Sequence, residues 1–193
     1  MRRVIIGLAL VLAGPALAEP VGITKERMEV TVPLPGGGSA AISRIQDNDH
    51  QVSGEWARTS RACPPFCIQP MQPAPGVTTI GELELLAMLE DPEAMVVDGR
   101  VRRDFEGGSI PGAINIPYTE AGDRLDELGC EVDFDGFDCA NAKPVALFCN
   151  GPWCGQSPAA ARRMIEAGYP AEKIFYYRGG MQVWRMLGLT VTE

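Results

Sequence analysis

Residues 144–168 read PVALFCNGPWCGQSPAAARRMIEAG, and this stretch decides the fold. The apolar run 144–148 predicts a buried central strand that ends at Cys149. A glycine-bearing loop follows, and 157–167 has the spacing of an amphipathic helix that Gly168 closes. A strand that leads through a loop into a helix is the repeating part of a βαβ unit, so the stretch predicts an α/β domain.

Elements on both sides of this stretch continue the alternation. The expected strands are 95–98, 113–116 and 174–177, and the expected helices are one that follows a Thr79 cap, 119–128 and 180–187. Strands that alternate with helices imply a mainly parallel central sheet with helices on both faces.

Residues 19–77 have a different, turn-rich composition. The runs 28–34 and 40–45 alternate around the turn PGGGS and predict a β-hairpin. Segment 47–76 contains five prolines and little periodicity, and we interpret it as an extended arm that lies on the main domain. The hairpin and the proline-rich arm therefore occupy 19–77, and the main domain occupies 78–193.

Residues 1–18 have the pattern of a secretory signal peptide. Arg2 and Arg3 precede the apolar run 4–12, and Ala-Leu-Ala at 16–18 has the form of a cleavage site. The run is too short to span a bilayer. We expect cleavage near Ala18, no stable membrane span afterwards, and a periplasmic or secreted protein whose cysteines meet an oxidising compartment. An uncleaved N-terminal anchor is the alternative.

Composition and charge exclude several classes of protein. Of 193 residues, 46% are hydrophobic and 22% are charged, which is ordinary for a globular domain. With 17 Lys+Arg against 25 Asp+Glu the net charge is −8, so we expect no nucleic-acid partner. A single histidine argues against a His-rich metal site, and we expect neither a metal nor a cofactor.

Cys149 is the strongest candidate for chemistry. A loop that runs from a strand end into a helix turns backbone N–H groups inward, and the helix dipole adds positive partial charge. Such surroundings lower the pKa of a thiol and hold an anion, so we expect Cys149 to be a partly ionised nucleophile. The alternative is an inert, buried cysteine at a strand end.

Four motifs within 78–191 resemble those of the rhodanese family, the sulfurtransferase fold. They are VVDGR at 96–100, DFEGGSIPGAINIP at 104–117, the strand, loop and helix that continue from FC at 148–149 to Gly168, and RGGMQVW at 178–184 followed by Gly188. Their order and spacing together match a single rhodanese-like domain, preceded here by an N-terminal extension.

The resemblance implies a sulfurtransferase of the thiosulfate type. Cys149 would take a sulfane sulfur from thiosulfate or a persulfide, carry it as a persulfide, and pass it to a thiol or another nucleophile. Backbone N–H groups would stabilise the outer sulfur as an oxyanion hole stabilises oxygen. Asp98 and Arg100 would support the loop, or Arg100 would lie near the donor anion. The rest of the expected active-site loop is Asn150, Gly151, Pro152, Trp153, Gly155, Gln156 and Ser157.

Three features of this chain differ from most family members: the active-site loop, Ser109 and Cys154. The loop 149–157 is longer and contains no Lys or Arg, so an anionic donor would depend on backbone N–H groups and outlying arginines. The candidates are Arg100, Arg102, Arg103 and Arg178. Ser109 stands where the family usually has histidine. We expect Trp153, at the loop tip, to be exposed enough to contact a substrate or a partner.

Cys154 has three interpretations. As a resolving thiol it would attack a persulfide or sulfenate on Cys149, forming a disulfide. As a redox partner it would make the chain a periplasmic thiol-disulfide oxidoreductase that uses Cys149 and Cys154, which is our first alternative function. In the third interpretation Cys154 packs beside Trp153 and never meets Cys149.

The remaining four cysteines form two local couples of disulfide candidates, Cys63 with Cys67 and Cys130 with Cys139. The second couple flanks an acidic segment and predicts a clasped hairpin. Cys63, Cys67 and Met71 also present soft ligands that a cuprous ion accepts, so a non-enzymatic sulfur- or copper-handling module is our second alternative. The expected partners are a small sulfur donor, a thiol acceptor and a periplasmic redox protein.

Overall fold

The computed structural model describes residues 19–192, so the expected signal peptide lies outside the described residues. The strands are β1 (Glu29–Pro33), β2 (Ser39–Ser43), β3 (Thr78–Ile80), β4 (Met95–Asp98), β5 (Ile114–Asn115), β6 (Glu131–Asp133), β7 (Gly136–Asp138), β8 (Val145–Phe148) and β9 (Ile174–Tyr177). The helices are α1 (Glu82–Glu90), α2 (Arg102–Glu106), α3 (Gln156–Glu166) and α4 (Gly180–Met186), with short 3-10 turns η1 (Gly54–Ala57), η2 (Leu125–Leu128) and η3 (Ala171–Lys173).

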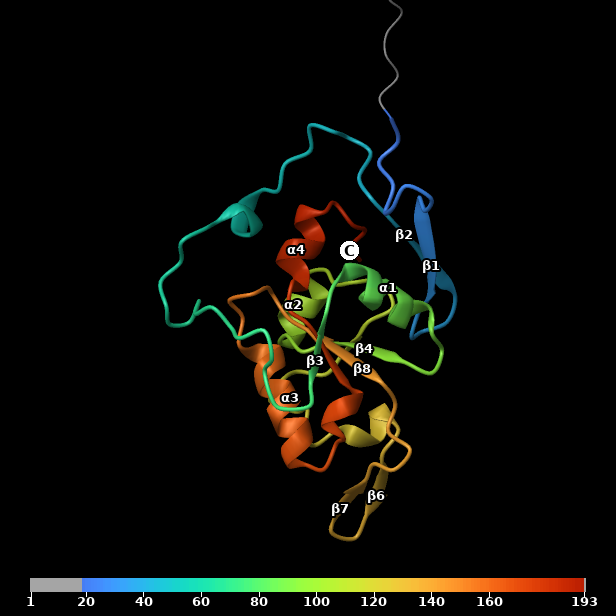
Figure 1. Cartoon of the computed structure of the whole chain (residues 1–193), viewed down its shortest axis with the longest axis vertical. Helices are drawn as coiled ribbons and strands as arrows, with labels where there is room; N and C mark the ends of the chain where they lie inside the picture. The colour runs from blue at the N-terminus through green and yellow to red at the C-terminus, as the bar shows by residue number, and fades with distance from the viewer. Residues whose placement is uncertain (1–18, 193) are drawn as a thin grey trace, which may run out of the picture.

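A five-stranded parallel sheet forms the centre of the domain (Figure 1), with the strand order β3-β9-β8-β4-β5. Strand β8 is the middle strand, and all four of its residues are buried. Because Cys149 directly follows β8, it lies at the carboxyl edge of the sheet. In open α/β sheets this edge is where ligands bind.

Helices cover both faces of the sheet, as predicted. Successive side chains of β8 point to opposite faces because a strand has a period of two residues. One hydrophobic layer joins β8 to α3 through Val145, Leu147, Ala160, Ala161 and Met164. The other joins β8 to α1 and α4 through Ala146, Phe148, Leu85, Leu86, Leu89, Met181 and Trp184.

The predicted N-terminal hairpin forms from β1 and β2, which pair antiparallel. Val30, Val32 and Ile42 are buried in the layer that contains α1. Beyond β2, Arg44 forms an isolated bridge with Leu189 and so ties the hairpin to the C-terminal segment. From there to β3 the chain follows an extended path outside the sheet, interrupted by η1 (Figure 1). This extended segment, residues 45–77, is called the arm below.

The prediction of a helix at 119–128 is wrong. The chain makes successive turns there, with N–H bonds from Glu120 to the Pro117 carbonyl and from Asp123 to the Glu120 carbonyl, before η2. Gly122 lies close to the Arg163 carbonyl of α3, and glycine is a poor helix former. The apolar residues that suggested a helix are nevertheless buried, because Leu125 and Leu128 of η2 pack in the core.

Thr79 belongs to a strand rather than to a helix cap. It pairs with Tyr176 in β9, and the first helix begins at Glu82, where the Gly81 N–H donates to the Glu84 carboxylate at 3.0 Å. Helix α2 was also not expected, because its five residues carry no apolar stripe. In the part of the chain that the structure describes, no helix is long and apolar enough to cross a membrane.

Candidate active site

The Cys149 thiol lies at the floor of the loop between β8 and α3. It is 2% exposed, and the Ser157 hydroxyl donates to its sulfur at 2.9 Å. The Cys149 S–H in turn donates to the Cys154 carbonyl at 3.3 Å. Ser157 lies in the first turn of α3, so the strand end and the helix start together position the sulfur.

The start of α4 supports the loop from the other side. The Met181 N–H donates to the Cys149 carbonyl, and the Gln182 N–H donates to the Asn150 carbonyl, both at 2.9 Å. Gly180 has a φ of +55°, and a Cβ on it would stand 2.4 Å from the Cys149 carbonyl oxygen. The second glycine of the RGGMQVW motif is therefore required both by its left-handed backbone and by its close approach to the loop 149–157.

The electrostatics of Cys149 differ from the expectation. Burial raises the pKa of its thiol well above the ordinary value, with contributions from Cys154, while hydrogen bonds from Ser157 lower it. Desolvation outweighs the N–H groups because the sulfur lies beneath the loop, away from water. In this state Cys149 is a protonated thiol rather than a partly ionised nucleophile.

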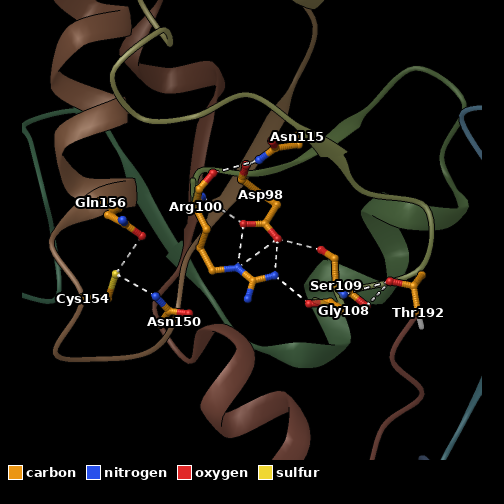
Figure 2. Close-up of polar contacts among 9 residues, drawn as sticks. All are labelled: Asp98, Arg100, Gly108, Ser109, Asn115, Asn150, Cys154, Gln156 and Thr192. Carbon is orange, nitrogen blue, oxygen red and sulfur yellow. Dashed lines mark hydrogen bonds and ion pairs between the residues drawn. The ribbon is translucent and has the colours of Figure 1, made fainter. Parts of the chain in front are cut away.

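Cys154 is the more acidic of the two free thiols. A hydrogen bond from Cys149, with further bonds from Gln156 and Asn150, lowers the pKa of Cys154 to about 7 despite its burial. The Cys154 sulfur lies 3.5 Å from Gln156 Oε1 and 3.9 Å from Asn150 Nδ2 (Figure 2). The Cys149 thiol reaches Cys154 through the Cys154 main-chain carbonyl, which accepts its S–H at 3.3 Å.

Asp98 and Arg100 form a buried ion pair beside the loop. The Arg100 Nη2 lies 2.6 Å from the Asp98 carboxylate, and both side chains are almost fully buried. Figure 2 shows the same Arg100 nitrogen donating to the Gly108 carbonyl, and the Ser109 hydroxyl donating to Asp98 at 2.7 Å. Asn115 donates to the main-chain carbonyls of Asp98 and Arg100.

The resemblance had implied that Asp98 supports the loop. The Asp98 carboxylate, however, makes no hydrogen bond to the loop 149–157. It binds Arg100 and Ser109, and the link to β8 is a backbone one, from the Gly99 N–H to the Phe148 carbonyl at 2.9 Å. Ser109, in the place of the usual histidine, serves as a donor to this buried carboxylate. The sequence motifs identify Asp98, Arg100 and Ser109 as a group, but they do not show which of the three faces the loop.

A cavity of about 580 Å³ opens next to Cys154. Its lining includes Arg100, Arg103, Asn150, Trp153, Cys154 and Gln156 from the domain, and Trp56, Arg61, Pro65 and Phe66 from the arm. Of the arginines considered from the sequence, Arg100 and Arg103 line the cavity, and Arg102 is exposed outside that lining. Arg178 instead donates to the Gln69 carbonyl of the arm.

The arm covers the loop tip. The Phe66 ring centroid lies 4.7 Å from that of Trp153, and the Gln69 N–H donates to the Pro152 carbonyl at 2.8 Å. The Trp153 indole N–H donates to Gln182 in α4. Trp153 is consequently half-buried between the arm and α4. Sequence reasoning missed this contact, although Phe66, an aromatic residue among the prolines of the arm, was a signal for it.

The other cysteines pair as disulfides. Cys63 is joined to Cys67, and Cys130 to Cys139, where the bond closes the β6–β7 hairpin. In this form Cys63 and Cys67 offer no thiolate to a cuprous ion. Among residues 19–192, no group of three or more His, Cys, Asp or Glu side chains is arranged to hold a metal ion.

The chain is similar to a known family and to several known proteins. A family model described as "Rhodanese-like domain" matches residues 82–187. An HTH-type transcriptional regulator of Mycobacterium tuberculosis is 36% identical over 114 residues, 59% of this chain and 44% of that protein. A tRNA uridine(34) hydroxylase of Teredinibacter turnerae is 30% identical over 105 residues, 54% of this chain and 30% of its own. The chain therefore spans less than half the length of these two relatives.

Solved structures give similar matches. A rhodanese-related protein of Thermoplasma volcanium is 26% identical with a TM-score of 0.44, covering 60% of this chain and 97% of that one. A human single-domain sulfurtransferase, TSTD1, is 24% identical with a TM-score of 0.41, covering 56% and 95%.

Proposed function

The chain belongs to the rhodanese-like family, and from this premise we propose that it is an exported sulfurtransferase that carries sulfane sulfur as a persulfide on Cys149. Membership of this family supports a sulfurtransferase-type function in general. The observation that carries the finer proposal is the position of the Cys149 sulfur, at the end of the middle strand and 2.9 Å from a donor hydroxyl of Ser157.

Loading requires the Cys149 thiolate. The Cys154 carbonyl accepts the Cys149 S–H, and the Cys154 thiol has a pKa of about 7, so Cys154 is the group that takes the Cys149 proton. The Cys149 thiolate then bonds to the outer sulfur of the donor. With thiosulfate, the sulfur–sulfur bond of the donor breaks and sulfite leaves with the electron pair. The product is a Cys149 persulfide whose terminal sulfur is negatively charged.

The surroundings of Cys149 suit this intermediate. The Ser157 hydroxyl and the Ser157 backbone N–H both favour negative charge on the sulfur. Fixed donors of this kind stabilise a charge that develops during a reaction, because they are already oriented. Discharge follows when an acceptor thiolate bonds to the outer sulfur, so that Cys149 leaves as a thiolate and recovers its proton from Cys154.

We place this activity in the periplasm or outside the cell. The pattern of residues 1–18 motivates that location, and the two disulfides suit an oxidising compartment. The partners are then a small sulfur donor and a thiol acceptor, which in this compartment can be the thiol of a redox protein.

Turnover provides the test. Wild-type protein should release sulfite from thiosulfate, or deliver sulfur from an organic persulfide to an acceptor thiol, in repeated cycles. Cys149→Ser should abolish turnover with both donors, whereas the double variant Cys130→Ser/Cys139→Ser, altered in the distant hairpin, should keep it. Equal turnover in Cys149→Ser and wild type would remove the proposal.

A thiol-disulfide oxidoreductase is the second candidate function, because Cys149 and Cys154 are both free cysteines and the Cys149 thiol lies 3.3 Å from the Cys154 carbonyl oxygen. It requires that the pair lose two hydrogen atoms to glutathione disulfide and form a bond between the two sulfurs. Mass spectrometry of the peptide that contains both cysteines distinguishes this product from a persulfide.

A further inference from the structure

The arm contributes an arginine to the cavity beside the active-site loop. Arg61 lies over the Phe66 ring at 4.7 Å and over the Trp153 ring at 5.3 Å, measured from its guanidinium carbon. Its side chain is 14% exposed, and it lines the same cavity as Cys154 and Arg100. Arg61 lies outside the residues matched by the family model, so this cation comes from the extension rather than from the domain.

The charge of Arg61 is only partly compensated. Its Nη2 binds the Glu55 carbonyl and lies 3.2 Å from the Glu55 carboxylate. That single carboxylate also pairs with Arg58 at 3.0 Å and is 68% exposed. Two arginines thus share one solvated acid. The Arg61 Nε is buried and has no hydrogen-bond partner among the described residues, and an unsatisfied buried donor of this kind is costly in the absence of a ligand.

A second arginine, the fully buried Arg100, lines the same cavity. Arg100 is held by Asp98 and Gly108 through its Nε and Nη2, while its Nη1 hydrogen-bonds to none of the described residues (Figure 2). Arg103 also lines the cavity, but its side chain is 89% exposed and paired with Asp104, and Asp104 and Glu55 line the cavity as well. The active-site loop itself, 149–157, supplies no basic side chain.

We propose that Arg61 is the specificity-determining residue for the sulfur donor, and that with Arg100 it binds the oxyanion group of a thiosulfate or thiosulfonate. The inference rests on the proposed sulfurtransferase function. The oxygens of such a donor accept hydrogen bonds from the two guanidinium groups, and the outer sulfur is directed toward Cys154, which lines the cavity, and the loop that covers Cys149. Charge-assisted bonds to a planar guanidinium suit an oxyanion of this shape. When the sulfur–sulfur bond breaks, the same cations hold the departing sulfite or sulfinate.

The competing explanation is that Arg61 only fixes the arm, through its contacts with the Phe66 and Trp153 rings and with Glu55. The test compares Arg61→Gln with Arg58→Gln, a matched control on the same arm that shares the Glu55 partner but does not line this cavity. Each protein is loaded with thiosulfate, and the rate of persulfide formation on Cys149 is followed. In parallel, the same thiol is alkylated with neutral iodoacetamide, which reports on access and ionisation but not on anion binding.

Arg61→Gln should lower kcat/KM for thiosulfate about tenfold, as expected for the loss of one charge-assisted hydrogen bond, and mainly through KM. Its alkylation rate should stay within about twofold of wild type, since no thiol contact is removed. Sulfate should inhibit loading of the wild type and of Arg58→Gln, and should inhibit Arg61→Gln about tenfold more weakly. Arg61→Lys keeps the charge and should recover part of the loss.

Equal loss in Arg61→Gln and Arg58→Gln, or a parallel fall in alkylation, would assign Arg61 to the structure of the arm and overturn the inference. Loading of the wild type by an organic persulfide but not by thiosulfate would overturn the inference and leave the proposed function standing. Absence of sulfur on Cys149 with either donor would instead remove the proposed function.

Discussion

Ser157 Oγ lies 2.9 Å from Cys149 Sγ and donates its proton to that sulfur. The two residues are eight positions apart, at opposite ends of a loop, and both are almost fully buried. The hydroxyl thereby joins the end of the middle strand to the beginning of α3. It is also a side-chain donor that favours the ionised form of Cys149.

Ser157→Ala removes that donor and nearly preserves the volume. We expect the rate of persulfide formation to fall by a factor of roughly 5 to 10, which corresponds to about 1 kcal/mol for one hydrogen bond. The pH at which Cys149 becomes reactive should move upward. The measurement is the pH profile of sulfur loading, and an unchanged profile would show that the hydroxyl plays no part in stabilising the sulfur anion.

The two thiols should titrate as a coupled pair. Alkylation requires the thiolate, so the reaction of Cys154 should increase with pH around its pKa of about 7, whereas Cys149 should react only at higher pH. In Cys149→Ala the pKa of Cys154 should rise, because its largest stabilising hydrogen bond is lost. In Cys154→Ala the pKa of Cys149 should fall, because a neighbouring anion is removed. Peptide mass spectrometry after iodoacetamide treatment at a series of pH values measures both, and shifts in the opposite directions would refute the coupling.

The buried Asp98–Arg100 pair should be important for stability. Asp98→Ala leaves the Arg100 guanidinium buried without its carboxylate, which costs about 3 to 5 kcal/mol in comparable buried pairs. The control is Asp104→Ala, which breaks the ion pair with exposed Arg103 and should cost less than about 1 kcal/mol. Denaturant unfolding measures both. Equal losses would mean that the buried cluster is no stronger than a surface pair.

Gly180 should tolerate no side chain. In Gly180→Ala the new Cβ overlaps the Cys149 carbonyl oxygen, and the left-handed backbone adds strain, so the loop has to shift. We expect a stability loss of roughly 2 kcal/mol and a marked fall in sulfur loading. Gly36→Ala is the control, because its Cβ would meet nothing within 4 Å. Normal loading by Gly180→Ala would argue that the close approach of α4 is not needed to shape the loop.

Much of the domain could be predicted from local patterns. The strand 144–148 and the helix 157–167 follow from apolar periodicity. The observed bounds, Val145–Phe148 and Gln156–Glu166, differ by one residue at the start of the strand and at each end of the helix. The prediction for segment 119–128 was wrong because its apolar residues have helical spacing. The chain forms turns there instead, with Gly122 packed against α3. The candidate nucleophile was identified from the sequence, but its raised pKa was not, because desolvation depends on how deeply the loop buries it.

The contacts between the arm and the loop could not be predicted from the sequence. Its contacts with the loop join residues that are far apart in the chain, such as Gln69 with Pro152 and Phe66 with Trp153. No periodicity marks those positions, since each contact consists of a single ring or a single backbone bond. Arg61 therefore could not be placed beside the candidate active site until the path of the arm was known.

The most direct measurement uses Cys154→Ser, in which the Cys63–Cys67 and Cys130–Cys139 disulfides leave Cys149 as the one free thiol of residues 19–192. After incubation with thiosulfate or an organic persulfide, its mass should increase by one sulfur atom, and a thiol acceptor should remove that sulfur. Cys149→Ser should show no such increase. A persulfide that forms in Cys149→Ser but not in Cys154→Ser would contradict the central claim, because the sulfur would then be carried by Cys154.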